Sequence, residues 1–263
     1  MLHDSIPVVM YHHIAPTGSD LNVYPEVYED HLRALRQRGW KTLSPDEFVH
    51  FLHHRNDKPK KCVLLTLDDG FADNYVYAYP LLKKYNMKAA IFVATDFIQD
   101  ADIDRSSFVP LSHKHAWELA RTERRSEVMC TWKELQEMEA SGAVDIQSHG
   151  MSHQTGKYMK DKNYAALRKD LSGSKALLEK RMAKKINHLC WPGGRNDEEG
   201  INIAVEAGYH ALYTTERGCN TVHTLTRVSR LPVKCKNGGW LMRNISIYSS
   251  VFLTKLYLAV RTG

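Results

Sequence analysis

Short apolar runs alternate with amphipathic stretches along most of this 263-residue chain. The first three runs cover residues 6–11, 62–67 and 88–94, and each is bounded by polar or turn-forming residues. Short, partly β-branched runs of this kind are typical of buried strands. Further strands are expected at 144–147, 186–191, 211–214 and 228–233.

Helical signals fill the stretches between these runs. Two capping boxes, each a Ser or Thr with a Glu three residues later, predict helix starts at Ser44 and Thr131. Apolar positions at helical spacing predict further helices at 28–38, 75–85 and 164–181, although Pro80 removes a hydrogen bond from the second of these. Alternation of strands and helices predicts a parallel sheet with helices outside it.

Seven strands suit either a closed barrel or an open doubly wound sheet. In both, the functional site lies at the carboxyl ends of the strands. Residues 96–129 interrupt the alternation with a polar stretch that contains Arg121, Arg124 and Arg125. We expect an insertion there with a helix near 115–122, because long insertions at strand ends often cover active sites.

Composition narrows the class of protein. With 43% apolar and 25% charged residues, the chain can bury a core and is not expected to be disordered. The net charge of +6 comes from scattered residues, so no nucleic-acid partner is predicted. Five cysteines form no C-x-x-C pair, which fits a reducing compartment. No signal peptide is visible at residues 1–5, so a cytoplasmic location is expected.

Two adjacent carboxylates, Asp68 and Asp69, end the apolar run at 62–67. They repel each other and resist burial unless something compensates. A metal ion would compensate, and it would divide the pair into one ligand and one free base. The alternative is a plain turn, which Asp-Asp-Gly also forms.

Two histidines follow the run at 144–147. His149 and His153 have i, i+4 spacing, which places both imidazoles on one side of a helical turn. Together with one carboxylate they make a three-ligand site with open positions, typical of a catalytic metal. In a chain with 14 histidines, a structural or surface role is the alternative.

A glycine-rich segment, Trp191-Pro192-Gly193-Gly194, follows the run at 186–191. The simplest interpretation is a tight connection. The functional hypothesis is a loop whose backbone N–H faces the site, with Trp191 as an apolar wall for a sugar ring.

These motifs, in this order, resemble those of the polysaccharide deacetylases, also called NodB-homology or carbohydrate esterase family 4 enzymes. Residues 66–70, Thr-Leu-Asp-Asp-Gly, resemble the family's T-F-D-D-G motif. Residues 148–153 resemble the second motif, and residues 191–194 resemble the third. The opening at residues 7–14, Pro-Val-Val-Met-Tyr-His-His-Ile, is similar to a subgroup that begins V-x-M-Y-H-x-I.

The resemblance implies a distorted (β/α)7 TIM-like barrel. It also implies metal-dependent removal of N-acetyl groups from an acetamido sugar, in a polysaccharide or a lipid-linked glycan. Asp68 would be the base and the Gly193 N–H would hold the oxyanion. One divalent ion, zinc first with cobalt, nickel or iron as alternatives, would be held by Asp69, His149 and His153.

The chain departs from the family pattern in two places. The arginine that precedes the third-motif proline in many relatives is absent, and Arg195 is either its substitute or a surface residue. The late histidine that serves as general acid is best matched by His223, with His12 or His13 as alternatives. The residues expected to line the substrate site are Trp191, Pro192, Arg195 and His13.

An apolar helix is expected at residues 240–263, following a catalytic domain at 1–239. It would either pack on the barrel or lie on a membrane surface, bringing the site to a lipid-linked sugar. It is too short and too polar to span a membrane. Two other functional hypotheses stay open: a carbohydrate-binding protein with a weakened site, and a deacylase of a non-sugar amide.

Overall fold

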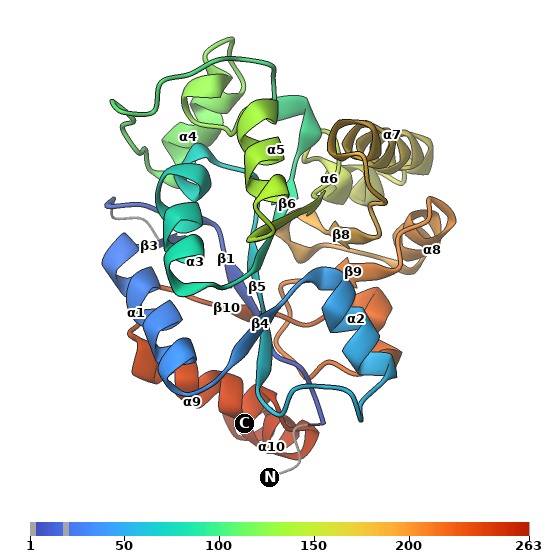
Figure 1. The fold of residues 1–263 in the computed structure, drawn as a ribbon. Coiled ribbons are helices and arrows are strands. Elements are labelled where there is room, and N and C mark those ends of the chain that lie inside the picture. Colours follow the sequence, from blue (N-terminus) through green and yellow to red (C-terminus); the bar gives the residue numbers. More distant parts are fainter. Residues whose placement is uncertain (1–3, 18–20, 263) are drawn as a thin grey trace.

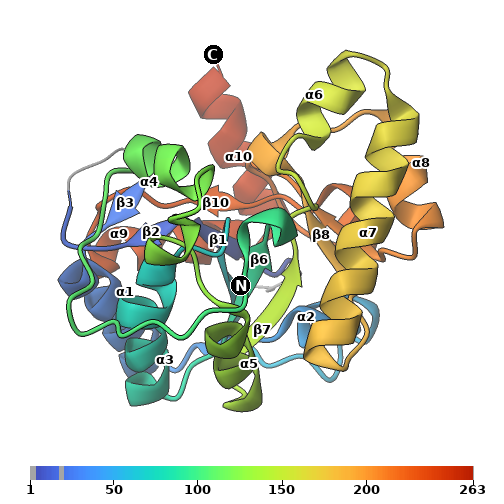
Figure 2. The ribbon, with the colours of Figure 1, turned by 90° about the horizontal axis from the view of Figure 1, so that it is seen from above.

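Parallel strands at the centre of the molecule run in the spatial order β10-β1-β5-β6-β7-β8-β9, with helices around them (Figures 1 and 2). The computed structural model describes residues 4–17 and 21–262, so residues 1–3 of the N-terminal stretch interpreted above lie outside the described residues. The strands in this order are β1 (Val8–Tyr11), β5 (Cys62–Leu67), β6 (Ala89–Val93), β7 (Val144–Ser148), β8 (His188–Cys190), β9 (Ala211–Tyr213) and β10 (Leu231–Pro232), and β2 (His13–Ile14) pairs with β3 (Asn22–Val23) outside this sheet.

The sheet curls into an incomplete barrel, and the predicted barrel fold is confirmed. A bridge between Tyr213 and Val228 carries the sheet from β9 toward β10. An eighth strand that the sequence did not reveal, β4 (Lys41–Leu43), pairs with the first half of β5, and β6 pairs with its second half. Because all these strands are parallel, their carboxyl ends meet at one edge of the barrel.

Side chains along β5 alternate between two apolar clusters, as the period of two in a strand requires. Leu64 belongs to the cluster that fills the barrel interior, together with Phe92 and Tyr213. Leu65 and Leu67 belong to the larger cluster under the surrounding helices. The alternation therefore directs the next inward position, Asp68, toward the interior of the barrel.

The described residues form ten α-helices, most of which pack around the sheet. Both predicted capping boxes are present, at the starts of α2 and α5. The predicted helix at 75–85 begins as a π-helix over Asn74–Ala78, which accommodates the N–H missing at Pro80. The helices are α1 (Pro25–Gln37), α2 (Pro45–His53), α3 (Tyr79–Tyr85), α4 (His113–Ala120), α5 (Trp132–Ala140), α6 (Thr155–Lys160), α7 (Tyr164–Met182), α8 (Glu198–Glu206), α9 (Gly238–Tyr248) and α10 (Val251–Thr262).

The expected insertion at 96–129 contains α4 and lies at the top of the molecule in Figure 1. Arg105 anchors it. Its guanidinium donates to both carboxylate oxygens of Glu134, at 2.7 and 2.9 Å, and to the carbonyl oxygens of Ser126 and Met129, at 2.8 and 2.9 Å. The insertion is therefore fixed over the barrel by one largely buried ion pair.

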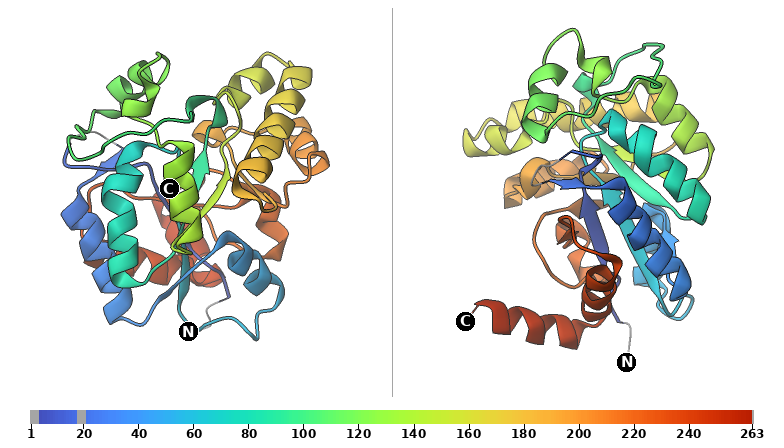
Figure 3. Two further views of the ribbon diagram at one scale, coloured as in Figure 1. Left: turned by 45° about the horizontal axis from the view of Figure 1, so that its top comes forward. Right: turned by 90° about the vertical axis from the view of Figure 1, so that its left-hand side faces the viewer.

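The C-terminal segment forms two helices, so the prediction of a single helix was wrong. Ser249 and Ser250 separate α9 from α10. Leu241 and Ile245 of α9 lie in the main core, and α9 packs against α1. In contrast, α10 extends from the body of the molecule (Figure 3, right). Among the described residues, no helix is both long enough and apolar enough to cross a bilayer.

Replacing Arg105 with Ala is expected to lower the free energy of unfolding by about 3–5 kcal/mol, because it leaves the largely buried Glu134 carboxylate unpaired. Lys133→Ala is the matched control, since Lys133 pairs with Asp102 in solvent and should change stability by less than about 1 kcal/mol. Urea unfolding of both variants measures the difference. Equal effects would show that Arg105 does not anchor the insertion.

Candidate active site and metal centre

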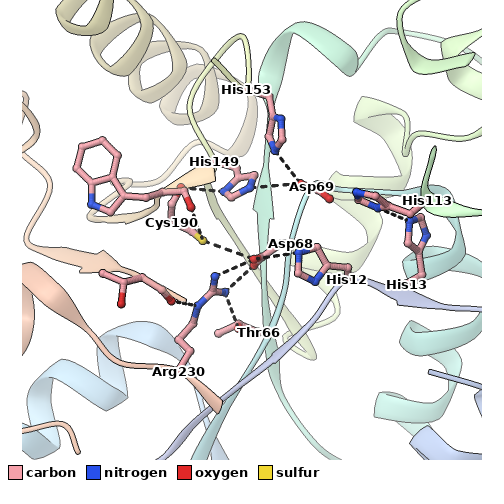
Figure 4. A network of polar contacts seen from close by, with 12 residues as sticks. His12, His13, Thr66, Asp68, Asp69, His113, His149, His153, Cys190 and Arg230 are labelled. Carbon is pink, nitrogen blue, oxygen red and sulfur yellow. Dashed lines mark hydrogen bonds and ion pairs between the residues drawn. The ribbon is translucent and has the colours of Figure 1, made fainter. Parts of the chain in front are cut away.

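Three side chains converge at the carboxyl ends of β5 and β7 (Figure 4). Asp69 Oδ1 lies 3.2 Å from Nε2 of His149 and 3.2 Å from Nε2 of His153. Their donor atoms lie within 4.8 Å of one another, Asp69 and His149 are buried, and His153 is partly exposed. Two imidazole nitrogens and a carboxylate oxygen with one open side fit a catalytic divalent ion.

The backbone explains how two neighbouring aspartates point to different places. Asp68 continues the inward series of β5, whereas Asp69 has φ +78° and is followed by Gly70 at φ +83°. This left-handed conformation costs a non-glycine residue about 1–3 kcal/mol and turns the Asp69 side chain out of the strand alternation. The turn therefore separates the two carboxylates into different surroundings.

The segment from His149 to His153 is a loop, so the predicted helical turn was wrong. Gly150 has φ +77°, and a Cβ there would lie 2.8 Å from Asp170 Oδ1. Asp170 accepts hydrogen bonds from the N–H groups of Met151 and Ser152, at 2.7 and 2.9 Å. A carboxylate from α7 thus holds the loop that brings both histidines to Asp69.

Each histidine is oriented by a different partner. The Nδ1–H of His149 donates to the carbonyl oxygen of Cys190 at 2.8 Å, which directs its Nε2 toward Asp69. His153 stacks on the indole of Trp117, with ring centroids 4.4 Å apart. Because Trp117 belongs to α4, the insertion contributes to the metal centre.

Arg230 holds Asp68. Its Nη1 and Nη2 donate to the two carboxylate oxygens at 2.7 and 2.8 Å, and its Nε donates to the carbonyl oxygen of Thr214 at 2.7 Å (Figure 4). Both side chains are at least 98% buried. Burial alone would raise the pKa of Asp68, but the Arg230 charge and hydrogen bonds outweigh it and keep that pKa below its usual value. Asp68 is therefore an oriented, ionised carboxylate.

Arg230 was not identified from the sequence as the partner of Asp68. Arg195, the expected substitute, is exposed on the loop after β8, and its stem lies beside Gly156. A signal was present, however. Arg230 lies inside the apolar run at 228–233, and a buried arginine requires an anionic partner.

A second group of donors, Asp68, His149 and Cys190, also lies close together. Arg230 already neutralises Asp68, and burial raises the pKa of the Cys190 thiol above its usual value. A metal there would have to displace a buried arginine and deprotonate a buried thiol. The Asp69 group is therefore the better metal site.

His12, which directly follows β1, lies beside Asp68. Its Nε2 lies 3.8 Å from Asp68 Oδ2. Burial lowers the pKa of His12, and the carboxylates of Asp68 and Asp69 oppose part of that effect. His223 does not join this group: it is exposed on the 3-10 segment Val222–Arg227, which packs against α2 and β9.

Three expected substrate contacts are buried instead. Trp191 is fully buried, so it cannot present a face to a sugar ring. His13 is 1% exposed, and its Nδ1–H donates to Asp73 Oδ2 at 2.5 Å. Pro192 is also buried, at the start of a 3-10 turn. These predictions failed because residues beside a site also supply the packing beneath it.

Gly193 occupies an open position in that turn. It has φ +63°, is exposed, and a Cβ there would meet no atom within 4 Å. The next N–H, of Gly194, donates to the Trp191 carbonyl oxygen at 2.8 Å and closes the turn.

Known proteins are similar to this chain in sequence and in fold. The sequence profile named "polysaccharide deacetylase" matches residues 55–212. YxkH of Bacillus subtilis (strain 168), whose name describes it as a polysaccharide deacetylase, is 32% identical over 213 residues, which are 81% of this chain and 65% of that protein. The poly-beta-1,6-N-acetyl-D-glucosamine N-deacetylase of Staphylococcus aureus (strain MSSA476) is 25% identical over 72% of this chain and 59% of its own length.

A solved structure agrees with these sequence matches. The deacetylase PplD of Streptococcus pyogenes, in complex with acetate, superposes with a TM-score of 0.76 at 25% identity, covering 92% of this chain and 98% of that one. The matched region of this chain spans about 60–65% of the length of these two curated relatives, which are longer proteins. The shared part is the barrel and its motifs.

Asp69→Ala is expected to abolish tight zinc binding, whereas Asp68→Asn keeps it, because only Asp69 faces both histidines. Trp117→Ala should weaken zinc binding about tenfold, the usual cost of losing a residue that orients a ligand. Competition titration against a chromophoric chelator measures all three affinities. Zinc loss in the Asp68→Asn variant, with its fold intact, would contradict the assignment.

Proposed function

The chain belongs to the polysaccharide deacetylase family, and on that premise we propose that it is a metal-dependent hydrolase that removes N-acetyl groups from an acetamido sugar. The observation that carries the proposal is the asymmetric aspartate pair: Asp68 is fixed by Arg230, and Asp69 faces two histidines. The Staphylococcus aureus relative is named for poly-beta-1,6-N-acetyl-D-glucosamine, which favours a polymer of acetylated hexosamine as substrate. A lipid-linked glycan with the same sugars is the alternative acceptor.

Asp69, His149 and His153 would hold one divalent ion, with zinc preferred and cobalt, nickel or iron also compatible with this donor set. When bound, such an ion lowers the pKa of a water molecule and polarises the acetyl carbonyl. The protein's task is then to accept a proton, hold the oxyanion and supply a proton to the amine.

Asp68 is the proposed base. Arg230 fixes the carboxylate by two hydrogen bonds and keeps it ionised, so it can accept the proton of the attacking water. The water oxygen would bond to the carbonyl carbon, and the Gly193 N–H is the proposed donor to the resulting oxyanion. Orientation by Arg230 means that little reorganisation accompanies the transfer.

His12 is the proposed acid. It follows β1, and its Nε2 lies 3.8 Å from Asp68 Oδ2, so a proton on this nitrogen could pass to the departing amine. Donation to the nitrogen allows the C–N bond to break, releasing acetate and the free amine of the sugar. Arg195 stays a predicted substrate contact at the rim, and it has no part in these proton transfers.

The hypothesis of a weakened, binding-only site rested on a base without its arginine and a missing acid. Arg230 and His12 supply both, which supports a working enzyme. Acetate release from a non-sugar amide, but not from acetylated hexosamines, would favour the remaining alternative within the hydrolases.

The proposal also includes contact of α10 with a membrane surface. Phe252, Leu256 and Val260 lie at helical spacing and are 73%, 55% and 75% exposed, with exposed Lys255 beside them. An apolar stripe next to a cation is typical of helices that lie in an anionic lipid interface. This arrangement would bring the barrel to a lipid-linked glycan at the cytoplasmic face, a location that stays a prediction.

Asp68→Asn is expected to keep zinc and lose acetate release from acetylated β-1,6-glucosamine oligomers by about 10²–10⁴-fold, the usual contribution of a general base. Asp100→Asn is the matched control, because that carboxylate is exposed and pairs only with Arg181 near the surface. Initial rates at saturating zinc measure the loss. Full activity in the Asp68→Asn protein would refute the assignment.

Changing Phe252, Leu256 and Val260 together to Ser should abolish co-sedimentation with anionic phosphatidylglycerol vesicles, because it removes the apolar stripe without changing the charge. Val205→Ser is the control, since Val205 is 50% exposed on α8, away from this stripe. If the triple variant partitions like the wild-type chain, α10 does not bind membranes.

A further inference from the structure

A second polar chain reaches the edge of the metal centre from the insertion side. His13 Nδ1 lies 2.5 Å from Asp73 Oδ2, and His13 Nε2 lies 3.1 Å from Nδ1 of His113, the first residue of α4. None of these three residues has a role in the proposed hydrolysis. His13 and Asp73 are buried, so this is not a surface contact. Buried partners of this kind can fix the orientation of a histidine that contacts a ligand.

Asp73 fixes the orientation of this chain. Its Oδ1 accepts from the N–H of Ile14 at 3.1 Å and from Nδ2 of Asn74 at 2.7 Å, so the carboxylate is held by three donors in total. His13 must therefore direct Nδ1–H toward Asp73 and Nε2 toward His113. The His13 ring also stacks on Phe71, with centroids 4.1 Å apart, so it has little freedom to turn.

His113 consequently has one nitrogen engaged and one directed away from His13. Its ring is partly exposed and lies edge-on to the ring of His12, with centroids 6.0 Å apart. Asp69 and His153 are close enough for their charges to act on it. Figure 4 shows His13 and His113 on the side of Asp69 away from His149. The outer nitrogen, Nε2, makes no hydrogen bond to the described residues and is therefore free to contact a ligand.

We propose, resting on the function proposed above, that His113 is a substrate-positioning residue whose Nε2 hydrogen-bonds a hydroxyl of the acetamido sugar. The hydrogen bonds from Asp73 through His13 to His113 explain why the partner is a hydroxyl, which can both donate and accept. If His13 is neutral, His113 carries its proton on Nδ1 and its Nε2 accepts; if His13 is protonated, the Nε2–H of His113 donates. A sugar hydroxyl satisfies both cases, whereas an anionic group would be repelled by the nearby Asp69.

Burial agrees with a neutral ring at this position. It lowers the pKa of His113 to about 4, although the charge of Asp69 opposes that effect. A neutral imidazole suits an uncharged sugar. The insertion would therefore select the sugar, while the barrel supplies the groups that react.

The test compares His113→Phe, which keeps an aromatic ring against Phe71 and Trp117, with His115→Phe on the solvent side of the same helix. Zinc-loaded full-length proteins are assayed for acetate release from β-1,6-linked N-acetylglucosamine oligomers and from their 3-deoxy and 4-deoxy analogues. His113→Phe should raise KM about tenfold for the natural sugar, with kcat changed less, because one hydrogen bond is lost. His115→Phe should match the wild type.

The deoxy analogues separate binding from a structural role. The wild-type protein should disfavour one analogue about tenfold, and the His113→Phe variant should have lost that discrimination, since the partner of the missing hydroxyl is gone. Retained discrimination, or equal losses on all three substrates, would overturn the inference and leave His113 as a tether for α4. An inactive wild-type protein would instead contradict the proposed function, so the two failures are distinguishable.

Discussion

A buried ion pair inside the barrel, between Arg230 and Asp68, is the constraint on which the site depends. Taking both charges out of water costs several kcal/mol per ion, and the pair is stable only because its geometry is bidentate and Arg230 also donates to the backbone. It links the segment before β10 to the end of β5, so the curl of the sheet and the position of the proposed base are fixed together. A base on an exposed loop would lack both the orientation and the guarantee of staying ionised. Removing either partner alone would leave an uncompensated charge in an apolar interior.

The second aspartate, Asp69, has no contact with Arg230 among the described hydrogen bonds and ion pairs, so its carboxylate can face the two histidines instead. The inward alternation of β5 ends at Asp68, and the left-handed turn at Asp69 redirects the next carboxylate to His149 and His153. Burial alone would raise the pKa of Asp69, but hydrogen bonds from the two histidines hold it well below its usual value. Two identical residues thus acquire different chemistry from one unfavourable backbone angle. The strain is tolerated because the strand before it and the insertion around it are closely packed.

Local patterns in the sequence predicted most of the frame and part of the site. The capping boxes, the buried strand at 62–67 and the two aspartates at its end are encoded within a few residues, so they could be recognised. The partner of Asp68 lies 162 residues away in the chain, and nothing in the local pattern connects the two. The loop after His149 depends on Asp170, and the break between α9 and α10 is held from the N-terminal segment, where Asp4 accepts from the Val251 N–H at 2.8 Å; both are long-range effects. Trp191 was misjudged because sequence does not distinguish the wall of a site from the core under it.

The division of the aspartate pair is therefore the central claim, and X-ray absorption at the zinc edge of the loaded protein tests it most directly. The described residues offer two sets of donors, and of these the set with Asp68 includes a sulfur atom, from Cys190. The account predicts nitrogen and oxygen neighbours at about 2.0–2.2 Å and no sulfur, as expected for Asp69, His149 and His153. A zinc–sulfur distance of about 2.3 Å would place the ion on Asp68 and Cys190, and it would contradict the assignment of Asp68 as the free base.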